Sequence, residues 1–255
     1  MDRPLSVTAL RCRTSDRTPG GARGAEALAQ ALDPDARLVG TPEHRIANWD
    51  EDLCDSRGCL LEAGGQVEDM LTAGRFPVLT ASDCSICMTT FQAVVRHAPD
   101  VRVLWLDAHG DSNTPETTPS GFLGGMCLAA ACGHWDSGFE PALDPERVLC
   151  CGVRQIDPGE RVPRQLRPSE VPDALRGSPV YVHLDVDVLD PDVLPSQFAE
   201  PRGMSEAGLR TLLADVRREC DVIGLEVTAF EAPEDPAERG RRTDLVASIV
   251  RALLP

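Results

Sequence analysis

Five side chains of the kinds that bind metal ions follow two apolar stretches of this 255-residue chain. They are Asp107, His109, Asp111, Asp185 and Asp187. The first three follow the run 101–106 and the last two the run 180–184, and residues two apart in an extended segment point the same way. Carboxylates crowded into one pocket do not stay ionised together without a cation. Oxygen ligands with one imidazole suit manganese, and five shareable ligands from two strand ends predict two ions.

Apolar runs typical of β-strands alternate with helical patterns along the chain. The expected strands are Ser6–Arg11, Phe76–Thr80, Val101–Leu106, Arg147–Gly152, Val180–Leu184 and Val222–Val227. The expected helices are Gly24–Leu32, Leu60–Leu71, Ile86–His97, Gly121–Cys132, Glu206–Cys220 and Asp244–Leu254. This alternation predicts one α/β domain over residues 1–255, with a parallel sheet covered by helices on both faces. Both carboxylate segments are expected at the edge where the carboxyl ends of the strands meet.

Charge and composition exclude several classes of protein. A net charge of −16 argues against nucleic-acid and anionic-membrane partners, and no apolar run approaches the roughly 20 residues of a membrane span. The start of the chain, Met1–Pro4, lacks a secretory signal pattern, so we expect a cytoplasmic protein. The chain has no lysine, which excludes Schiff-base, pyridoxal-phosphate and P-loop chemistry, because each needs the lysine amine.

Ten cysteines are many for a cytoplasmic protein, but their irregular spacing supports no zinc ribbon. Most lie among apolar neighbours, where small core residues are expected. Cys84 and Cys87 are separated by two residues before an expected helix, a spacing that leaves a redox motif open as an alternative. A redox function would leave the two carboxylate segments unexplained.

Four segments together resemble the ureohydrolases, the family of arginases and agmatinases. Segments 107–121 and 184–191 resemble the family's two metal segments. Segment 152–160 resembles the loop that binds the substrate's α-amino group, and segment 83–85 takes the place of its Gly-Gly-Asp-His-Ser turn. The resemblance runs in register over about residues 75–232. It implies a three-layer α/β/α sandwich around a parallel sheet, two Mn²⁺ ions and an amino-acid substrate with a guanidino group.

The resemblance also implies a role for each matching residue. The implied metal ligands are Cys84, Asp107, His109, Asp111, Asp185 and Asp187. Asp107 and Asp185 would bridge the two ions, and Asp111 and Asp187 would also aim the nucleophile, a hydroxide shared by the metals. The implied contacts to the substrate's α-carboxylate and α-amino group are Asn113, Ser120 and Asp157, with Glu160 behind Asp157.

Cys84 is the first departure from the arginase pattern, because it stands where the family has its first metal histidine. A thiolate can bind a divalent metal and is softer than imidazole, so the metal preference would shift toward zinc or iron. The alternative is that Cys84 is a small buried residue and that the first metal lacks this ligand. A second departure is the loop Ser196–Pro201, which replaces the Gly/Thr loop that follows the second metal segment.

Three further departures concern proton transfer and substrate charge. Gly124 stands at the family's proton-shuttle histidine, and Phe122 stands at an asparagine near the substrate carboxylate. Ala229 stands at the glutamate that faces the guanidinium, although a shift of register would bring Glu226 or Glu231 into that role. A guanidinium, which is always charged, would then lack a partner. An N-hydroxyguanidine is less basic than a guanidine, so it depends less on a facing glutamate and on a proton-shuttle histidine.

This pattern most resembles the ureohydrolase branch, known from D-cycloserine biosynthesis, that hydrolyses Nω-hydroxy-L-arginine to hydroxyurea and L-ornithine. The alternatives are an ordinary arginase or agmatinase and a metal-poor, ureohydrolase-like binding protein. Agmatine has no α-carboxylate, so retention of Asn113 and Ser120 argues against it. The expected partner is a small amino acid. A monomer is expected because the chain stops directly after its last expected helix, with no tail to exchange between subunits.

Overall fold

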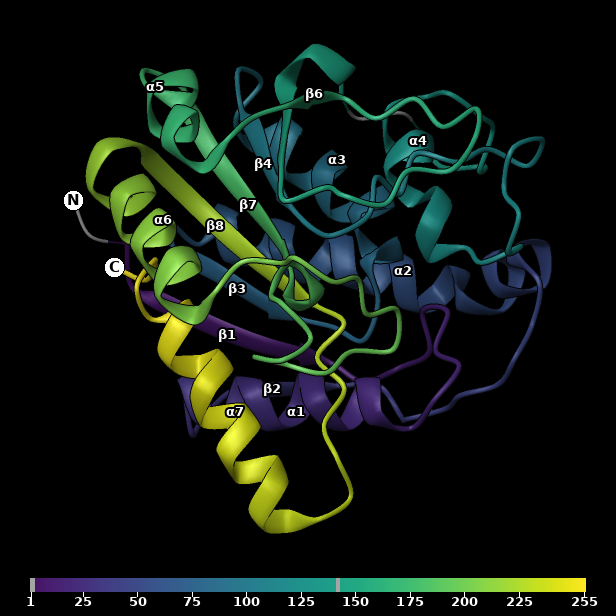
Figure 1. Ribbon diagram of the computed structural model, residues 1–255, viewed down its shortest axis with the longest axis horizontal. Helices are drawn as coiled ribbons and strands as arrows, with labels where there is room; N and C mark the ends of the chain where they lie inside the picture. The colour runs from purple at the N-terminus through teal and green to yellow at the C-terminus, as the bar shows by residue number, and fades with distance from the viewer. Residues whose placement is uncertain (1–2, 141–142) are drawn as a thin grey trace.

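The structure is a computed structural model that describes residues 3–140 and 143–255, and eight strands in these residues form one sheet (Figure 1). The strands are β1 Leu5–Leu10, β2 Arg37–Val39, β3 Phe76–Thr80, β4 Arg102–Leu106, β5 Val148–Cys151, β6 Arg164–Gln165, β7 Pro179–Asp185 and β8 Asp221–Thr228. Their order is β2-β1-β3-β8-β7-β4-β5-β6, and all neighbours pair in parallel. The expected parallel sheet is confirmed.

Helices cover both faces of the sheet. They are α1 Gly20–Leu32, α2 Trp49–Thr72, α3 Cys87–His97, α4 Cys127–Ala131, α5 Val171–Leu175, α6 Glu206–Glu219 and α7 Pro236–Val250. Helices α1, α5, α6 and α7 share one apolar core with the sheet, whereas α2, α3 and α4 share a second core on its other face. The expected three-layer α/β/α sandwich is therefore confirmed (Figure 1).

The strand register places the two carboxylate segments beside each other. Strands β4 and β7 are neighbours, and Leu106 pairs with Leu184 at their carboxyl ends. The acidic residues that follow these two leucines therefore leave the sheet together. Strand β8 lies on the other side of β7, where Asp185 pairs with Thr228. The carboxyl edge of three adjacent strands thus carries the polar groups, as expected for an open α/β sheet.

Several element boundaries differ from the sequence-based expectation. Helix α2 begins eleven residues before Leu60, with acidic residues 50–52 in its first turn, which suit the positive end of the helix dipole. Helix α7 begins at Pro236, because Asp235 caps it by accepting a 2.8 Å hydrogen bond from the Glu238 amide. The expected helix Gly121–Cys132 is wrong for its first half: a 3-10 turn at 124–126 precedes a helix of only five residues. The short outer strands β2 and β6 were not expected.

Most cysteines lie in the interior, as expected, but one pair forms a disulfide that was not foreseen. Cys12 follows β1 and is bonded to Cys59 in α2. Cys84, Cys87, Cys127, Cys150 and Cys151 are free and buried. Within the described residues, no helix is both long enough and apolar enough to span a membrane.

Candidate active site

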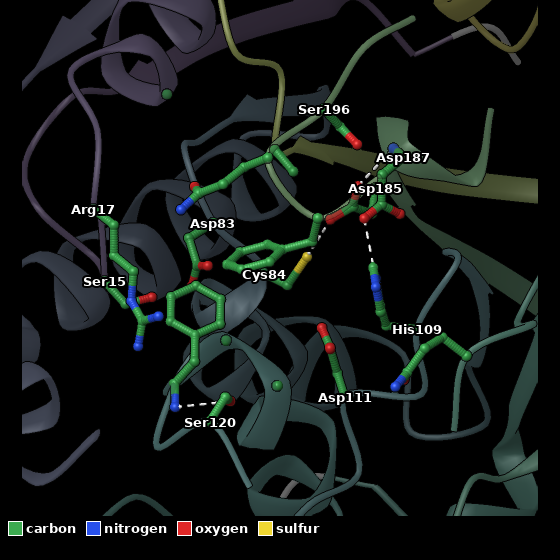
Figure 2. A pocket seen from close by; sticks show the side chains of 18 of the residues that line it. Ser15, Arg17, Asp83, Cys84, His109, Asp111, Ser120, Asp185, Asp187 and Ser196 are labelled. Carbon is green, nitrogen blue, oxygen red and sulfur yellow. Dashed lines mark hydrogen bonds and ion pairs between the residues drawn. The ribbon is translucent and has the colours of Figure 1, made fainter. Parts of the chain in front are cut away.

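A cavity of about 390 Å³ opens at the carboxyl edge of the sheet. Its walls come from the loops that follow β1, β3, β4, β5, β7 and β8. All the predicted site residues except Asp107 line it directly, and Asp107 lies beneath it, 1% exposed. Figure 2 shows Cys84, His109, Asp111, Asp185 and Asp187 pointing toward one another across the cavity. The volume and the buried carboxylates are typical of a small-molecule site.

His109 lies between carboxylates from the two acidic segments. Its Nδ1 is 3.0 Å from Asp187 Oδ2 and 3.4 Å from Asp107 Oδ1. One ligand atom from each of these three residues lies within 4.8 Å of the other two. Atoms of a common metal coordination sphere are this close, because each lies about 2 Å from the ion. These three side chains are therefore one possible metal-binding group.

Cys84 joins a second group beside the first. It opens the 3-10 turn Cys84–Ile86 after β3, where it is 4% exposed. Its Sγ is 2.9 Å from Asp185 Oδ2 and 3.1 Å from Thr228 Oγ1. Ligand atoms of Cys84, Asp107 and His183 lie within 4.8 Å of one another, so this group shares Asp107 with the first. The thiol therefore faces the carboxylate cluster rather than the apolar core.

Backbone amides hold the carboxylates in place. Asp187 Oδ1 accepts a 3.0 Å hydrogen bond from the Ala108 amide, which ties the β7 segment to the β4 segment. Asp185 Oδ1 accepts one of 2.7 Å from the Asp187 amide.

Asp111 has a φ of +45°, in the left-handed region that non-glycine residues rarely adopt. Such backbone conformations are concentrated at functional sites, where the surrounding structure enforces them.

The buried carboxylates shift one another's protonation. Burial and the charge of Asp187 raise the pKa of Asp107 to about 6. Burial and neighbouring carboxylates also raise the pKa values of Asp111 and Asp185 well above the ordinary range. Burial alone would lower the pKa of His109, but its hydrogen bonds to Asp107 and Asp187 outweigh that effect and raise the pKa to about 12. Without a metal, the negative charge of these carboxylates is therefore offset by a proton held on His109. A bound cation would neutralise the same carboxylates.

These residues fit a pair of divalent metal ions. Asp107 Oδ2 is buried and has no hydrogen-bond partner, and a buried acceptor of this kind needs a cation or a donor. The neighbouring donors comprise carboxylate oxygens, imidazole nitrogens and one thiol sulfur. Oxygen and imidazole suit Mn²⁺, while the thiol favours a softer ion beside it.

The expected substrate contacts lie along the β4–β5 side of the cavity. Asn113 Nδ2 donates a 2.9 Å hydrogen bond to Asp157 Oδ2, so these two side chains lie together. Glu160 lies behind them, where it accepts hydrogen bonds of 2.8 Å from the amides of Ser112 and Asp157. Ser120 also lines the cavity, and its Oγ accepts a 3.2 Å hydrogen bond from the Phe122 amide. Glu160 therefore holds the loop that carries the polar contacts.

Gly124 lies against side chains that occupy the space a larger residue would need. A Cβ at this position would be 2.6 Å from Asp83 Oδ2 and 2.6 Å from Phe122 Cε1, closer than packed atoms approach. The cavity therefore has no room for an imidazole at Gly124 unless Asp83 or Phe122 moves. In this region the site differs from the arginase pattern in shape as well as in residue type.

The structure decides which glutamate of the last strand region faces the cavity. Glu231 lines it, and its Oε1 accepts a 2.5 Å hydrogen bond from Thr18 Oγ1. Glu226 is fully buried on β8, beside His183. Ala229 lines the cavity with a φ of +60° and brings no polar side chain. The Ala229 side chain itself would offer a guanidinium only a methyl group, while Glu231 brings a carboxylate to the same cavity.

Part of the wall, formed by Asp16 and Arg17, was missed by sequence reasoning, whereas Phe198 belongs to the loop Ser196–Pro201 already singled out in the sequence. The Arg17 guanidinium lies 4.5 Å above the Phe122 ring, and the centre of the Phe122 ring is 5.0 Å from that of Phe198. The Phe198 ring centre is in turn 6.4 Å from that of His109. Asp16 also lines the cavity. Asp16 and Arg17 lie on an irregular loop, where no periodic pattern marks them.

The redox alternative is disfavoured by the surroundings of the two cysteines. Cys84 and Cys87 are free and buried. Burial raises the pKa of the Cys87 thiol to about 11 and that of Cys84 well above its ordinary value. A redox-active pair needs an accessible thiol with a lowered pKa. Without a metal, neither thiol has that property.

Comparison with known proteins assigns the class. The model of the arginase family matches residues 8–254, so the chain belongs to this family and is a hydrolase of amidino carbon–nitrogen bonds. The Nω-hydroxy-L-arginine amidinohydrolase of Streptomyces lavendulae is 36% identical over 259 residues, which cover 95% of this chain and 93% of that protein. The arginase of Bacillus caldovelox is 42% identical over 101 residues, or 37% of this chain and 34% of that protein.

Solved structures support the same fold. The crystal structure of arginase from Bacillus caldovelox superposes with a TM-score of 0.84 at 23% identity, over 98% of both chains. The proclavaminate amidino hydrolase from Streptomyces clavuligerus superposes with a TM-score of 0.73 at 20% identity, over 99% of this chain and 91% of that one. The sheet and its helical layers are therefore those of the arginase fold.

Proposed function

We propose that this protein hydrolyses Nω-hydroxy-L-arginine to hydroxyurea and L-ornithine with two bound divalent ions, Mn²⁺ being the expected metal. The relative from Streptomyces lavendulae, named for hydroxyarginine, supports this substrate because the two chains match over nearly their whole lengths. When bound, the ions would supply a water whose pKa is low enough for nucleophilic attack near neutral pH. The oxygen of one water adds to the guanidino carbon, the bond from that carbon to the ornithine nitrogen breaks, and a proton of the water ends on that nitrogen.

The chain's own residues divide the remaining work. The proposed metal ligands are Cys84, Asp107, His109, Asp111, Asp185 and Asp187. Asp107 would be shared between the ions because it belongs to both ligand groups. Asp185, whose Oδ2 lies 2.9 Å from Cys84 Sγ and whose Oδ1 accepts from the Asp187 amide, would be the second shared ligand. Asp111 and Asp187 line the cavity and would accept a hydrogen bond from the nucleophile, which aims it at the guanidino carbon. Burial and neighbouring carboxylates raise the pKa of Asp111, so a bound cation would be needed to keep this acceptor ionised.

The substrate's amino-acid end would lie at the Asn113–Asp157 side. Asn113 and Ser120 offer hydrogen-bond donors for the α-carboxylate, and the Asp157 carboxylate suits the α-ammonium group. Glu160 would act through the loop, because both its oxygens are bonded to backbone amides. Agmatine has no α-carboxylate and would leave the donors of Asn113 and Ser120 unused.

The observation that carries the choice of substrate is the apolar wall at Ala229, together with the filled space at Gly124. The Ala229 side chain offers no carboxylate to a cationic guanidinium, and the Glu231 carboxylate that also lines the cavity has one oxygen engaged by the Thr18 hydroxyl, so the buried charge would be paired less well than beside a glutamate at Ala229. An imidazole at Gly124, which could pass a proton to the leaving nitrogen, would need Asp83 or Phe122 to move. An N-hydroxyguanidine is less basic, so it can enter the cavity uncharged and needs neither a carboxylate partner nor the proton shuttle as much as a guanidinium does. This combination favours hydroxyarginine over arginine.

Restoring a carboxylate tests this reasoning. In Ala229→Glu we expect kcat/KM for arginine to rise relative to that for hydroxyarginine by about tenfold or more, because hydrogen bonds to charged groups are worth about 1.5–3 kcal/mol. Ala229 already has a Cβ at its positive φ, so the longer side chain adds little backbone strain. The control is Ala199→Glu, which adds the same group to another wall of the cavity. An unchanged ratio in Ala229→Glu would remove the main support for hydroxyarginine.

We also propose that the chain is one domain that acts as a monomer in the cytoplasm. All eight described strands share one sheet, and the net charge of −16 adds repulsion between copies, although salt screens it within about 8–10 Å. Disulfides are rare in the cytoplasm, so a Cys12–Cys59 bond that persists in the cell would argue against this location. Light scattering at physiological salt tests the monomer, and thiol counting in rapidly quenched cells tests whether this pair is reduced there.

A further inference from the structure

A histidine that the proposed mechanism does not use lies beneath the metal-ligand cluster. His183 is on β7, two residues before Asp185, so both side chains leave the same face of the strand. It is fully buried, and its ring is stacked on the indole of Trp105 with the ring centres 3.7 Å apart and the planes 1° apart. The stacking fixes the plane of the imidazole. A buried ring held in this way cannot turn without displacing Trp105.

One nitrogen of this ring is occupied by a carboxylate. His183 pairs with Glu226 on β8, and its Nδ1 is 2.6 Å from Glu226 Oε1. The other oxygen of Glu226 accepts a 3.2 Å hydrogen bond from the Tyr181 hydroxyl. The contact with Glu226 occupies Nδ1, and Nε2 is left as the ring nitrogen that can face another group.

The second nitrogen faces the cluster. Nε2 is 3.5 Å from Thr228 Oγ1, and the same hydroxyl is 3.1 Å from Cys84 Sγ. One ligand atom each from Cys84, Asp107 and His183 lies within 4.8 Å of the other two. A carboxylate that accepts from one ring nitrogen while the other faces a metal site is the usual support of a metal-bound histidine. The fixed ring, the occupied Nδ1 and the two neighbouring ligands together place Nε2 where it could bind a metal ion.

We propose that His183 is a ligand of the metal ion held by Cys84 and Asp107, oriented by Glu226 and Trp105. This inference rests on the proposed function only in assuming a metal site at the cluster. It implies that the two metal positions differ chemically. The Cys84 position would combine thiolate, imidazole and carboxylate, a donor set that suits zinc, iron or cobalt, whereas the position of His109 and Asp187 has no sulfur and suits manganese.

The test measures metal binding directly. Metal-free protein is titrated with Co²⁺, with the bound metal counted by mass spectrometry and the visible and near-ultraviolet absorption followed. The wild-type chain should bind two ions, one with the absorption of a thiolate ligand. His183→Asn should weaken that ion by at least about 100-fold and change its absorption, while the second ion stays bound. The control His97→Asn, at an exposed histidine on α3, should behave like wild type.

Two further measurements guard against a variant that does not fold. Glu226→Gln has nearly the same shape and should weaken the thiolate-bound ion by about 10- to 100-fold, the range expected when the partner of a ligating histidine is altered. Nitrogen NMR of the zinc-loaded wild-type chain should show the His183 Nε2 signal shifted by metal binding. An unshifted signal, or wild-type Co²⁺ affinity and absorption in a folded His183→Asn, would overturn the proposal.

The outcome separates this inference from the proposed function. If wild-type protein hydrolyses hydroxyarginine but His183→Asn keeps both ions unchanged, the ligand assignment fails and the proposed reaction survives. If His183→Asn loses the thiolate-bound ion but no variant or wild-type preparation hydrolyses hydroxyarginine, the ligand assignment holds and the substrate proposal fails.

Discussion

Asp16 offers a quantitative test of the electrostatics of the cavity. Its side chain is 6% exposed, with Oδ2 accepting a 2.9 Å hydrogen bond from the Thr14 amide and Oδ1 unpartnered. Burial, opposed by hydrogen bonds from Ser82 and Thr14, raises its pKa from 3.8 to about 6. The folded protein therefore holds this proton more tightly than the unfolded chain. The resulting stabilisation is complete below pH 3.8 and is lost as the pH rises through about 6.

The expected size follows from the shift. A difference of about 2 pH units at 1.36 kcal/mol each amounts to about 3 kcal/mol of unfolding free energy. Asp16→Asn cannot ionise, so relative to wild type it should gain most of that amount, about 2 kcal/mol, between pH 4 and pH 7. The assay is urea unfolding of the metal-free protein, with a chelator present, at both pH values. The control is Asp35→Asn, at an exposed aspartate. Parallel pH dependence of Asp16→Asn and wild type would refute the reasoning.

Three other substitutions probe the metal cluster and the loop behind it. Asp107→Ala should abolish activity and release metal, because this carboxylate belongs to both groups of ligands; two tightly retained ions would contradict a shared role. Cys84→Ala should weaken one metal selectively while Cys84→His still binds two, as measured by equilibrium dialysis; unchanged affinity in Cys84→Ala would make Cys84 a packing residue. Glu160→Ala should cost at least about 2 kcal/mol in urea unfolding and raise KM, because it leaves two backbone amides unpaired. An unchanged KM in Glu160→Ala would show that Glu160 does not position the loop that binds the substrate.

The sequence predicts the fold well where the pattern is periodic. Apolar runs of strand length alternate with helical patterns, and this decides the parallel sheet and its two helical layers. The carboxyl edge then follows from topology, which is why Asp107 and Asp185 could be expected together before any coordinates. His183 also had a visible signal, since it is two residues before Asp185 on the same strand. That position places His183 beside the site. It stands within an apolar run, however, where a histidine is easily interpreted as a core residue.

Other features depend on packing that no local pattern records. Asp16 and Arg17 belong to an irregular loop, and only the folded chain brings them to the cavity. The helix expected from Gly121 begins only at Cys127, after a 3-10 turn at Gly124–Met126, and the apolar pattern of this segment does not distinguish the two. The bond between Cys12 and Cys59 joins segments 47 residues apart, and irregular cysteine spacing does not indicate a pairing.

The most direct test of the central claim is a side-by-side measurement of kcat/KM for Nω-hydroxy-L-arginine and L-arginine by the Mn²⁺-loaded wild-type protein. Hydroxyurea and urea are quantified separately, and agmatine is included as a substrate without an α-carboxylate. We predict hydroxyurea as the main product and a preference of about 10- to 150-fold for hydroxyarginine, the value of one missing charged hydrogen-bond partner of about 1.5–3 kcal/mol. Equal kcat/KM values for the two amino acids, with urea formed readily from arginine, would contradict the account and identify an ordinary arginase.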